Sequence, residues 1–375
     1  MKTNHYDAVI VGARAAGAAT AMLLARRGMR VLAVDRASYG SDTLSTHALM
    51  RPAVIQLERW GLLSEVIDAG TPPVLRAVFH YPDKSVGLDI EALYAPRRTV
   101  LDRILADAAR EAGAEVRFGV VVDDLRFDAS GRVTGIRGRD DDGHDLTLSA
   151  GIVIGADGIR SVVAQQTAAP VTREATAGAA CVYGYFRGVE AEGYEWIYGD
   201  GVAAGLIPTN DGELCVFAGG STQRFRRDVQ PNLEAGFTRI LEEASPAVAE
   251  RIARGTHAGR FRGFAGVRGY YRKPYGPGWA LVGDAGYFRD PIVNHGITDA
   301  FRDAELLARA VDGTTSFADY EATRDRVTKD LFAVTERLAA YDWHRDELEG
   351  LLRDVSRATR PEMRLLAEWE LAAAS

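Results

Sequence analysis

Residues 9–36, VIVGARAAGAATAMLLARRGMRVLAVDR, decide the fold of the first part of this chain. Residues 6–11 are apolar without alternation, which is typical of a strand buried in a parallel sheet. Residues 18–27 favour a helix that ends at Gly28, and residues 29–35 form a second apolar run of strand length. The order strand, glycine turn, helix and strand predicts a Rossmann-like α/β domain with a parallel sheet.

The glycine turn departs from the usual dinucleotide-binding fingerprint, G-x-G-x-x-G. The middle glycine, which lets the backbone approach a pyrophosphate, is replaced by Arg14, between Gly12 and Gly17. Gly12 permits the sharp turn, and Gly17 lets the helix pack on the strand, so the N–H groups of the helix N-terminus can face a phosphate. Asp35 ends the second strand, where an acceptor for a ribose hydroxyl is expected. These residues alone leave open a glycine-rich turn that binds no nucleotide.

The composition narrows the class of protein. With 375 residues, of which 47% are hydrophobic and 26% charged, the chain can form a large core. Its net charge of −7 disfavours a nucleic-acid partner. Cys181 and Cys215 lack the spacing of metal ligands, so we expect no metal site and a reducing, cytoplasmic location. No apolar run reaches roughly 18 residues and Asp7 interrupts the start, so we expect no integral membrane association and no signal peptide.

The pattern along the chain changes twice after the βαβ unit. Antiparallel strands are predicted in 72–97, and strand-like runs rich in aromatic residues and glycine fill 172–262. Residues 276–311 return to a strand, a loop and a long helix, and 317–375 are charged and helical throughout. We therefore expect a nucleotide-binding domain interrupted by an inserted, mostly antiparallel β-sheet and followed by C-terminal helices. The predicted boundaries are 1–71, 98–168 and 264–316 for the nucleotide-binding domain, 72–97 and 169–263 for the sheet domain, and 317–375 for the helical region.

Two further motifs follow buried strands. Residues 155–161 read GADGIRS, and residues 283–285 read GDA, with Asp290-Pro291 and Gly296-Ile297 shortly after. Together with the N-terminal glycine turn, these motifs resemble the FAD-dependent monooxygenases of the p-hydroxybenzoate hydroxylase type, whose relatives include geranylgeranyl reductases and flavin-dependent halogenases. The resemblance covers most of residues 5–310. Three ordered motifs are far more specific than one, so a turn without a nucleotide becomes a remote alternative.

The resemblance implies FAD as the cofactor and NAD(P)H as its reductant. The glycine turn with Arg14 would surround the pyrophosphate, and Asp157 would lie beside it. Asp35 would bind the adenosine ribose, and Val122 would lie where a backbone group meets the adenine. Arg98 matches a polar residue that family members place against the ribityl and phosphate region.

The resemblance also places the flavin ring. Asp284 would accept hydrogen bonds from ribityl hydroxyls, and the turn from Pro291 to Thr298 would open a helix whose N-terminus faces the pyrimidine ring. This turn departs from the family's glycine-rich pattern, because Asn294 replaces a glycine and Thr298 replaces an asparagine. The implied FAD-binding residues are Gly12, Ala13, Arg14, Ala16, Gly17, Asp35, Arg36, Arg98, Val122, Asp157, Gly283, Asp284, Pro291, Gly296, Ile297 and Thr298.

Few side chains are candidates for catalysis. His47 lies in the loop that family members fold over the flavin, and an unperturbed histidine pKa of about 6.5 would suit a general base. A loop histidine bonded to backbone is the equally weighted alternative. His295, beside Gly296, is a second candidate, with a positioning role preferred over proton transfer. An aromatic set on the inserted sheet would line a substrate pocket or belong to ordinary sheet core; its members are Tyr183, Tyr185, Trp196, Tyr198 and Phe217.

The resemblance implies a hydroxylase that uses O₂ and forms a flavin C4a-hydroperoxide, acting on a small aromatic or related apolar compound. A reductase or dehydrogenase of the geranylgeranyl reductase type is the main alternative, because "TLSTHAL" (43–49) resembles that branch. A halogenase is less favoured, since Trp196 is separated from Ile207-Pro208 and the stretch TPPVLRAV has no lysine. A flavin-binding redox sensor is a third, non-enzymatic alternative. The chain would be a monomer or a homodimer, and its C-terminal helices would cover the active domain or form a dimer surface.

Overall fold

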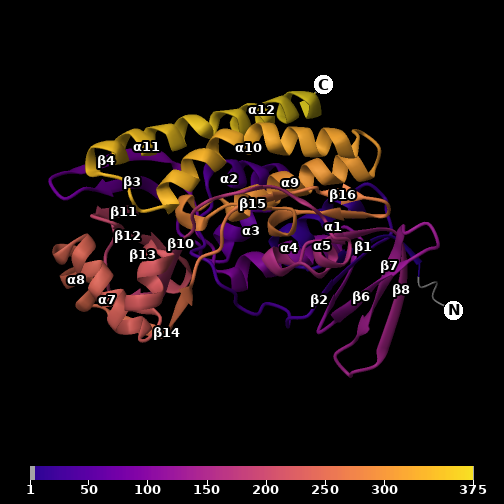
Figure 1. Cartoon of the computed structure of the whole chain (residues 1–375), viewed down its shortest axis with the longest axis horizontal. Coiled ribbons are helices and arrows are strands. Elements are labelled where there is room, and N and C mark those ends of the chain that lie inside the picture. The colour runs from indigo at the N-terminus through magenta and orange to yellow at the C-terminus, as the bar shows by residue number, and fades with distance from the viewer. Residues whose placement is uncertain (1–4, 375) are drawn as a thin grey trace.

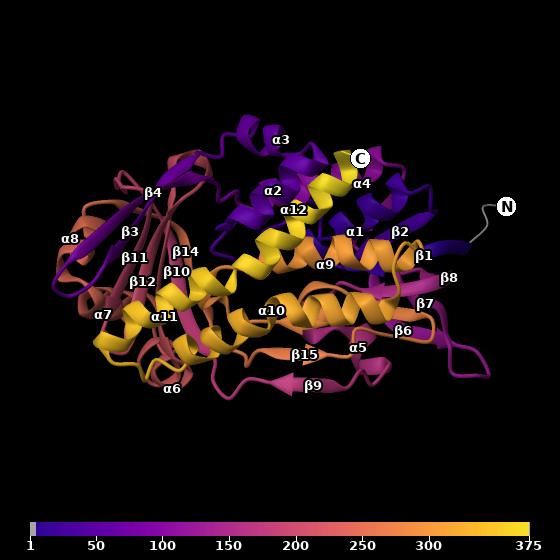
Figure 2. The same cartoon turned by 90° about the horizontal axis from the view of Figure 1, so that it is seen from above.

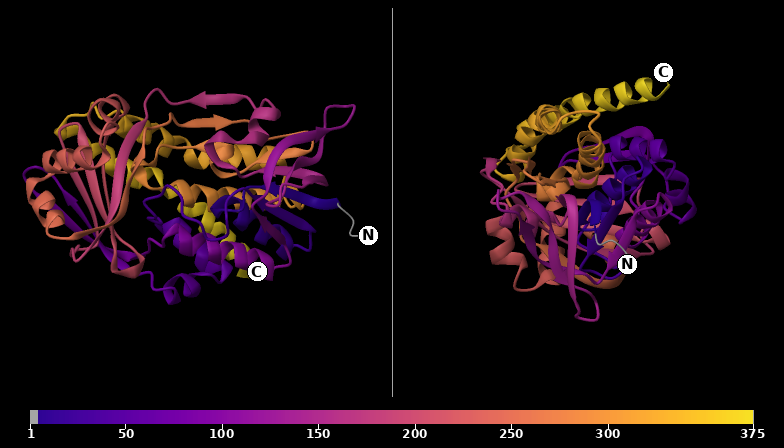
Figure 3. Two further views of the ribbon diagram at one scale, coloured as in Figure 1. Left: turned by 90° about the horizontal axis from the view of Figure 1, so that it is seen from below. Right: turned by 90° about the vertical axis from the view of Figure 1, so that its right-hand side faces the viewer.

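The computed structural model describes residues 5–374, which form two large sheets at opposite ends of an elongated molecule (Figures 1 and 3). Sheet A follows the order β16-β17-β8-β1-β2-β5, and the antiparallel strands β6 and β7 extend it from β8. Strands β17, β8, β1, β2 and β5 are parallel to one another, as a Rossmann-like sheet requires. The strands are β1 (His5–Val11), β2 (Val31–Asp35), β5 (Glu115–Phe118), β6 (Val121–Phe127), β7 (Val133–Arg139), β8 (Asp145–Gly155), β16 (Tyr275–Gly276) and β17 (Trp279–Leu281).

Helices cover both faces of sheet A. The alanine-rich helix α1 (Ala15–Arg26) is buried along nearly its whole length, because it packs between the sheet and the helices α4 (Arg98–Glu111) and α9 (Gly296–Val311). Small side chains allow this close approach. The helices α2 (Arg51–Trp60) and α3 (Leu63–Asp68) join the same core, and α5 (Val162–Gln166) packs against the opposite face.

Sheet B has the order β14-β10-β13-β12-β11-β3-β4 and is antiparallel except where β3 pairs with β11. Its outer face packs against α7 (Leu233–Ala244) and α8 (Pro246–Ala253), and its inner face is directed toward the loops of sheet A. The strands are β3 (Val74–His80), β4 (Ser85–Leu93), β10 (Ala179–Arg187), β11 (Tyr194–Gly199), β12 (Val202–Pro208), β13 (Leu214–Ser221) and β14 (Thr256–Phe264). A helical segment follows β13, with α6 (Thr222–Arg224) and a π-turn over Phe225–Val229.

The C-terminal helices bridge the two sheets. Figure 2 shows α10 (Phe317–Ala339), α11 (Arg345–Ala358) and α12 (Arg360–Ala374) running along the molecule, with α11 toward sheet B and α12 over α2 and α9. A small third sheet of β9 (Val171–Glu174), β15 (Tyr270–Arg272) and β18 (Tyr287–Phe288) lies between the two large ones. Within residues 5–374, no helix combines the length and apolar composition that crossing a membrane requires.

The predicted fold class is confirmed: a Rossmann-like α/β part, a separate and mostly antiparallel sheet, and C-terminal helices. The interpretation of 172–262 named only strands, whereas 233–253 form α7 and α8. Both helices are amphipathic and bury apolar residues such as Phe237 and Ile252 against sheet B. The aromatic strands around these two helices dominate the sequence pattern of 172–262, so the helices were not predicted.

Candidate functional site

The turn between β1 and α1 requires both of its glycines. Gly12 has a φ of +103°, and a Cβ there would lie 2.4 Å from the carbonyl oxygen of Ala156. A Cβ on Gly17 would lie 1.8 Å from the carbonyl oxygen of Gly12. Arg14 is the N-cap residue of α1, but its side chain does not cap the helix. The first-turn N–H groups of α1 therefore have no side-chain cap and can face an anion.

Asp35 ties the end of β2 to this turn. Its Oδ2 accepts the backbone N–H of Ala13 at 2.8 Å, and its Oδ1 accepts that of the residue two positions later at the same distance. The backbone N–H of Val120 donates to the carbonyl oxygen of Asp35 at 2.9 Å, so β6 starts beside this edge. Arg36 is exposed there, and Val122 is half-buried on β6. Asp35 and the start of β6 thus lie together at this edge.

The side chain of Arg14 points out of the glycine turn. Its Nη1 donates to Asp102 Oδ2 at 2.9 Å and to the carbonyl oxygen of Ser41 at 3.1 Å, and its Nη2 donates to Ser41 Oγ at 3.0 Å. Asp102 also binds Arg98, whose Nε and Nη2 donate to Oδ1 at 3.0 and 2.8 Å. One carboxylate therefore holds both arginines beside the turn. A groove beside Arg14 and the end of β2 is lined by Ala13, Arg14, Asp35, Ala37, Ser38, Gly40, Ser41, Asp102 and Phe118.

Asp157 lies beside Gly12 of the glycine turn, in the segment that follows β8. The backbone N–H of Ala156 donates to the carbonyl oxygen of Val11 at 2.7 Å, which joins this segment to the end of β1. Asp157 Oδ2 accepts the N–H of Val162 at 2.6 Å, while Oδ1 is buried and has no partner in the described part of the chain. Burial raises the pKa of the Asp157 carboxyl. A buried acceptor without a donor is typical of a site where a bound molecule supplies a hydroxyl or another protonated group.

Gly283, which precedes Asp284, lies where α9 packs against the start of α1. Gly283 has a φ of +59°, and a Cβ on it would lie 2.8 Å from the Cβ of Ala16 and 3.7 Å from the Cβ of Ala300. The start of α1 and the second turn of α9 therefore meet at this glycine. Burial, and secondly the negative charge of Asp299, raise the pKa of the Asp284 carboxyl to about 7.

The turn before α9 accommodates the substitution of asparagine for glycine. Asn294 has a φ of +55°, in the left-handed region that asparagine tolerates better than most residues. Its Oδ1 accepts the hydroxyl of Thr46 at 2.7 Å, so its side chain also holds the loop that carries His47. A glycine at this position would have the conformational freedom but not this contact.

The first turn of α9 presents an open backbone and a polar atom. A Cβ on Gly296 would meet no atom within 4 Å, and Thr298 Oγ1 is buried without a partner among residues 5–374. His295 Nδ1 bonds to the carbonyl oxygen of Val293 at 2.6 Å. Burial, followed by the positive charge of Arg289, lowers the pKa of His295 to about 4, so this histidine is neutral at physiological pH. Pro291 is exposed and Ile297 is buried in the same turn.

His47 is buried at the junction between the two sheets. It is 1% exposed and has a φ of +69°, which is unusual for a residue with a Cβ. Its Nε2 lies 2.5 Å from the hydroxyl oxygen of Tyr185, and its Nδ1 has no partner in the described chain. Burial lowers the pKa of His47 well below its usual value, and Arg97, Arg98 and Arg262 lower it further. The imidazole is therefore neutral and keeps a lone pair on one ring nitrogen.

Aromatic side chains line the inner face of sheet B beside this histidine. The hydroxyl oxygen of Tyr183 accepts the N–H of Ser45 at 3.2 Å, which joins β10 to the His47 loop. Four of the five predicted pocket residues belong to one apolar cluster that also contains Ala48: Tyr183, Tyr185, Trp196 and Phe217. Tyr198 lies on the same strand as Trp196 but packs in a neighbouring cluster beneath the C-terminal helices, against Tyr81 and Trp343.

Arg97 is a site residue that the sequence prediction missed. Its guanidinium carbon lies 3.7 Å from the ring centre of Tyr185, and its Nη1 donates to Glu213 at 2.6 Å. Its Nη2 also lies 3.5 Å from Asp42. Arg97 and Arg98 are adjacent at the start of RRTVLDRIL, but only Arg98 matches a position of the family's sequence pattern. The contacts of Arg97 link segments far apart in the chain, so local pattern could not reveal them.

A family model described as "FAD binding domain" matches residues 5–335. Among curated proteins, the chain is 27% identical over 369 residues to the menaquinone reductase of Mycolicibacterium smegmatis, covering 89% of this chain and 83% of that protein. Among solved structures, the flavin-dependent brominase Bmp2 superposes with a TM-score of 0.81 at 18% identity, covering 98% of this chain and all of that one. PqsL, a probable FAD-dependent monooxygenase from Pseudomonas aeruginosa, superposes with a TM-score of 0.76 at 21% identity, over 93% and 100% of the two chains. These two structures establish the likeness of fold.

Proposed function

Since the chain belongs to the FAD binding domain family and is an FAD-dependent oxidoreductase, we propose that it is an NAD(P)H-consuming monooxygenase that hydroxylates a small aromatic or related apolar compound. The observation that supports this proposal is the His47–Tyr185 pair, which lies on the aromatic inner face of sheet B and against the loops that lead to α9. Sites that orient a small substrate are lined mainly by apolar and aromatic side chains with a few polar groups, which is the composition of this cluster.

The residues fit FAD, as the buried polar atoms without partners indicate. Asp157 Oδ1 and Thr298 Oγ1 are such atoms, and both belong to the segments that surround the glycine turn. The first turn of α1 would bind the pyrophosphate and Asp35 the adenosine ribose, with Asp284 on the ribityl hydroxyls. FAD, when bound, would accept a hydride from NAD(P)H and supply the chemistry that activates O₂.

His47 and Tyr185 would handle the proton of the substrate. When His47 Nε2–H donates to the hydroxyl oxygen of Tyr185, the lone pair lies on Nδ1, the atom that has no partner in the described chain. Nδ1 would then accept the proton of a substrate hydroxyl and raise the electron density of its ring. The nearby guanidinium of Arg97 would stabilise the negative charge that this transfer leaves on the substrate. The surrounding aromatic residues would exclude water.

Isotopic oxygen tests the proposal. The protein loaded with FAD, supplied with NADH or NADPH and ¹⁸O₂, is incubated with phenols, anilines and quinolones. We expect one ¹⁸O atom in the product, one NAD(P)H consumed for each, and one oxygen atom released as water. His47→Gln should lower kcat with a smaller effect on KM, because it removes the base and keeps a side chain of similar size. Stoichiometric hydrogen peroxide with no labelled product would argue against hydroxylation.

A reductase acting on a C=C bond without oxygen insertion is the second candidate. The similarity to a menaquinone reductase over 89% of the chain favours it. In that reaction the Tyr185 hydroxyl would donate the proton that accompanies hydride transfer to the substrate. Anaerobic turnover of an isoprenoid quinone or alkene in deuterated water, with deuterium in the saturated product, would identify this reaction. A halogenase is a third and less favoured candidate, which halide incorporation in the same assay would reveal.

A further inference from the structure

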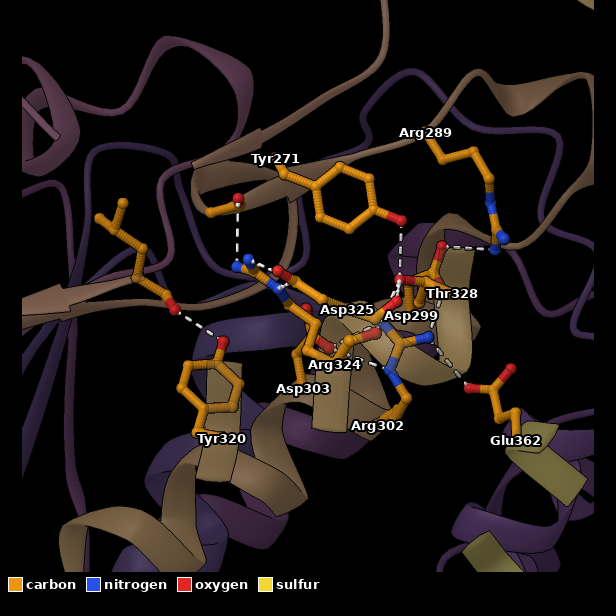
Figure 4. Close-up of polar contacts among 12 residues, drawn as sticks. Tyr271, Arg289, Asp299, Arg302, Asp303, Tyr320, Arg324, Asp325, Thr328 and Glu362 are labelled. Atoms are coloured by element: carbon orange, nitrogen blue, oxygen red, sulfur yellow. Dashed lines mark hydrogen bonds and ion pairs between the residues drawn. The ribbon is translucent and has the colours of Figure 1, made fainter. Parts of the chain in front are cut away.

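A cluster of ionisable side chains is buried between α9 and the C-terminal helix α12 (Figure 4). None of its members is more than 5% exposed: Arg289, Asp299, Arg302, Asp303 and Glu362. Burying charges costs several kcal/mol each unless they are paired and hydrogen-bonded. Stability alone does not explain five buried ionisable side chains in one cluster, because an apolar cluster of similar volume would stabilise the fold as well.

The centre of this cluster is Asp299, in the first turn of α9. Its Oδ2 accepts from Arg289 Nη2 at 2.7 Å, and its Oδ1 accepts from Arg302 Nη1 at 2.5 Å. Arg289 lies directly before residues 290–298, which comprise the turn into α9 and the first three residues of that helix, and Asp299 lies directly after them. The ion pair therefore closes the loop 290–298 at its base. This loop contains Asn294 with its left-handed backbone and Thr298 with its unpartnered hydroxyl.

Arg302 connects this closure to the C-terminal helix. Its Nε and Nη2 bind Asp303 Oδ1 at 3.0 and 2.7 Å, and its Nη1 reaches Glu362 Oε1 at 3.2 Å. Glu362 lies sixty positions further along the chain, on α12. In Figure 4 the side chain of Glu362 approaches Arg302 from a separate helix. It is the one acid of this group that does not come from α9.

The helix α12 is held in place independently of this contact. Its Trp369 ring lies 4.5 Å from the guanidinium carbon of Arg309 on α9 and 5.5 Å from that of Arg59 on α2. Leu365 and Leu366 of α12 join the core around α1 and α9. Removing the Glu362 carboxylate should therefore leave the helix docked, and the effect on Arg302 can be observed separately.

We propose that Glu362 is a positioning residue of the flavin site, acting through Arg302 and Asp299 to hold the loop 290–298 in the conformation that receives the flavin ring. The helix α12 is thus part of the cofactor site without touching the cofactor. The inference rests on the proposed placement of the ring against this loop, and it is independent of which substrate is oxidised or reduced. Its role explains why the carboxylate is buried two residues after the start of α12.

The experiment compares Glu362→Ala and Glu362→Gln with Glu368→Gln in the full-length protein. Glu368 is exposed on the same helix, so its substitution makes the same chemical change away from Arg302. The readouts are the dissociation constant for FAD, the visible circular dichroism of bound flavin, and the thermal unfolding temperature. We expect Glu362→Ala to raise the dissociation constant about tenfold, as loss of a charged hydrogen bond would, and to change the flavin dichroism. Glu362→Gln should show a smaller change, because its amide oxygen can still accept from Arg302, and Glu368→Gln should match the wild type.

Two outcomes would overturn the inference. In one, both Glu362 variants bind FAD with wild-type affinity and dichroism, whatever their unfolding temperature. In the other, Glu368→Gln alters the flavin as strongly as they do. If Glu362→Ala does not fold, Glu362→Gln decides between the two results. None of these measurements needs turnover, so a wild-type protein without hydroxylase activity would contradict the proposed function and leave this inference standing.

Discussion

Arg14 stands where a glycine usually lets the backbone approach a pyrophosphate, and its contacts explain how the turn accommodates it. The side chain leaves the turn and binds Asp102 and Ser41, so the first-turn N–H groups of α1 are not covered by it. Gly12 has no such freedom, because its φ of +103° and the 2.4 Å approach to Ala156 exclude a Cβ.

These two positions should respond differently to substitution. We expect Arg14→Gly to retain FAD with altered affinity and to lose about 1 kcal/mol of unfolding free energy, since partly exposed hydrogen bonds are removed. Gly12→Val should lose FAD binding altogether. Titration of FAD-free protein with FAD, with urea unfolding in parallel, measures both effects. An equal loss of FAD binding in the two variants would refute the distinction.

Asp284 gives a pH dependence at the same scale. Its pKa is raised to about 7, so between the ordinary aspartate value and pH 7 the folded protein binds a proton that the unfolded chain has released. This contribution to stability is present at low pH and is lost as the pH rises through about 7. Asp284→Asn removes it. We therefore expect the variant to gain about 2–3 kcal/mol relative to the wild type between about pH 5 and pH 8, measured by urea unfolding of FAD-free protein.

The exposed Asp211 supplies the control for this measurement. It has a φ of 63°, which asparagine tolerates, so Asp211→Asn makes the same chemical change at the surface. Any change that this variant shares with Asp284→Asn does not come from the buried site of Asp284. Parallel curves for Asp284→Asn and the wild type would show that Asp284 does not titrate in this range.

The turn into α9 combines a left-handed backbone with a contact between two loops. Asn294 adopts a left-handed backbone there and binds Thr46, and the helix begins two residues later. The sequence departs from the family's glycine-rich pattern here, so the backbone path of this turn was not predicted. The structure shows an asparagine meeting the same backbone requirement while adding a contact to the His47 loop.

Substitutions of Asn294 should separate these two roles. Asn294→Gly keeps the accessible backbone and loses the Thr46 contact, so we expect a loss of about 1 kcal/mol or less in unfolding free energy. Asn294→Val also places a β-branched residue at positive φ, and should lose at least about 2 kcal/mol. Thermal unfolding and retention of FAD on gel filtration measure the two effects. The turn would be less constrained than proposed if valine were no worse than glycine.

At the scale of the whole molecule, Arg97 joins the α/β part to sheet B. It is the N-cap residue of α4, pairs with Glu213 beside β13, approaches Asp42 and stacks on Tyr185. Its positive charge is also the second cause, after burial, of the low pKa of His47. One side chain thus affects both the joining of the two sheets and the protonation of the candidate base.

Arg97→Met tests both effects. Breaking a largely buried ion pair should cost about 2–3 kcal/mol of unfolding free energy. Loss of the positive charge should raise the pKa of His47 toward its usual value, and move the acidic limb of the pH–rate profile to higher pH. Arg187→Met is a matched control, because Arg187 binds the same Glu213 but is largely exposed and is not among the causes of the His47 shift. An unmoved acidic limb in Arg97→Met would separate His47 from the rate-determining protonation.

Features that depend on neighbours in the chain could be predicted from the amino-acid sequence. The spacing of Gly12, Gly17 and Asp35, the apolar strands, and the motifs at 155–161 and 283–285 fixed the Rossmann-like part and its family, because turn geometry and strand burial are local requirements. The aromatic alternation in β10 likewise placed Tyr183 and Tyr185 on one face.

Which of these features come into contact depends on how the whole chain folds. His47 and Tyr185 are 138 positions apart, and Arg302 and Glu362 are sixty apart. Their contacts depend on how sheet B docks on the loops of sheet A and how α12 crosses α9. That docking is set by the summed burial of many side chains from distant segments, which no local pattern encodes. The fold, and His47 as a candidate base, could therefore be predicted from short motifs. The contact of His47 with Tyr185, its neighbour Arg97 and the buried ion pairs beneath α12 were seen only in the folded structure.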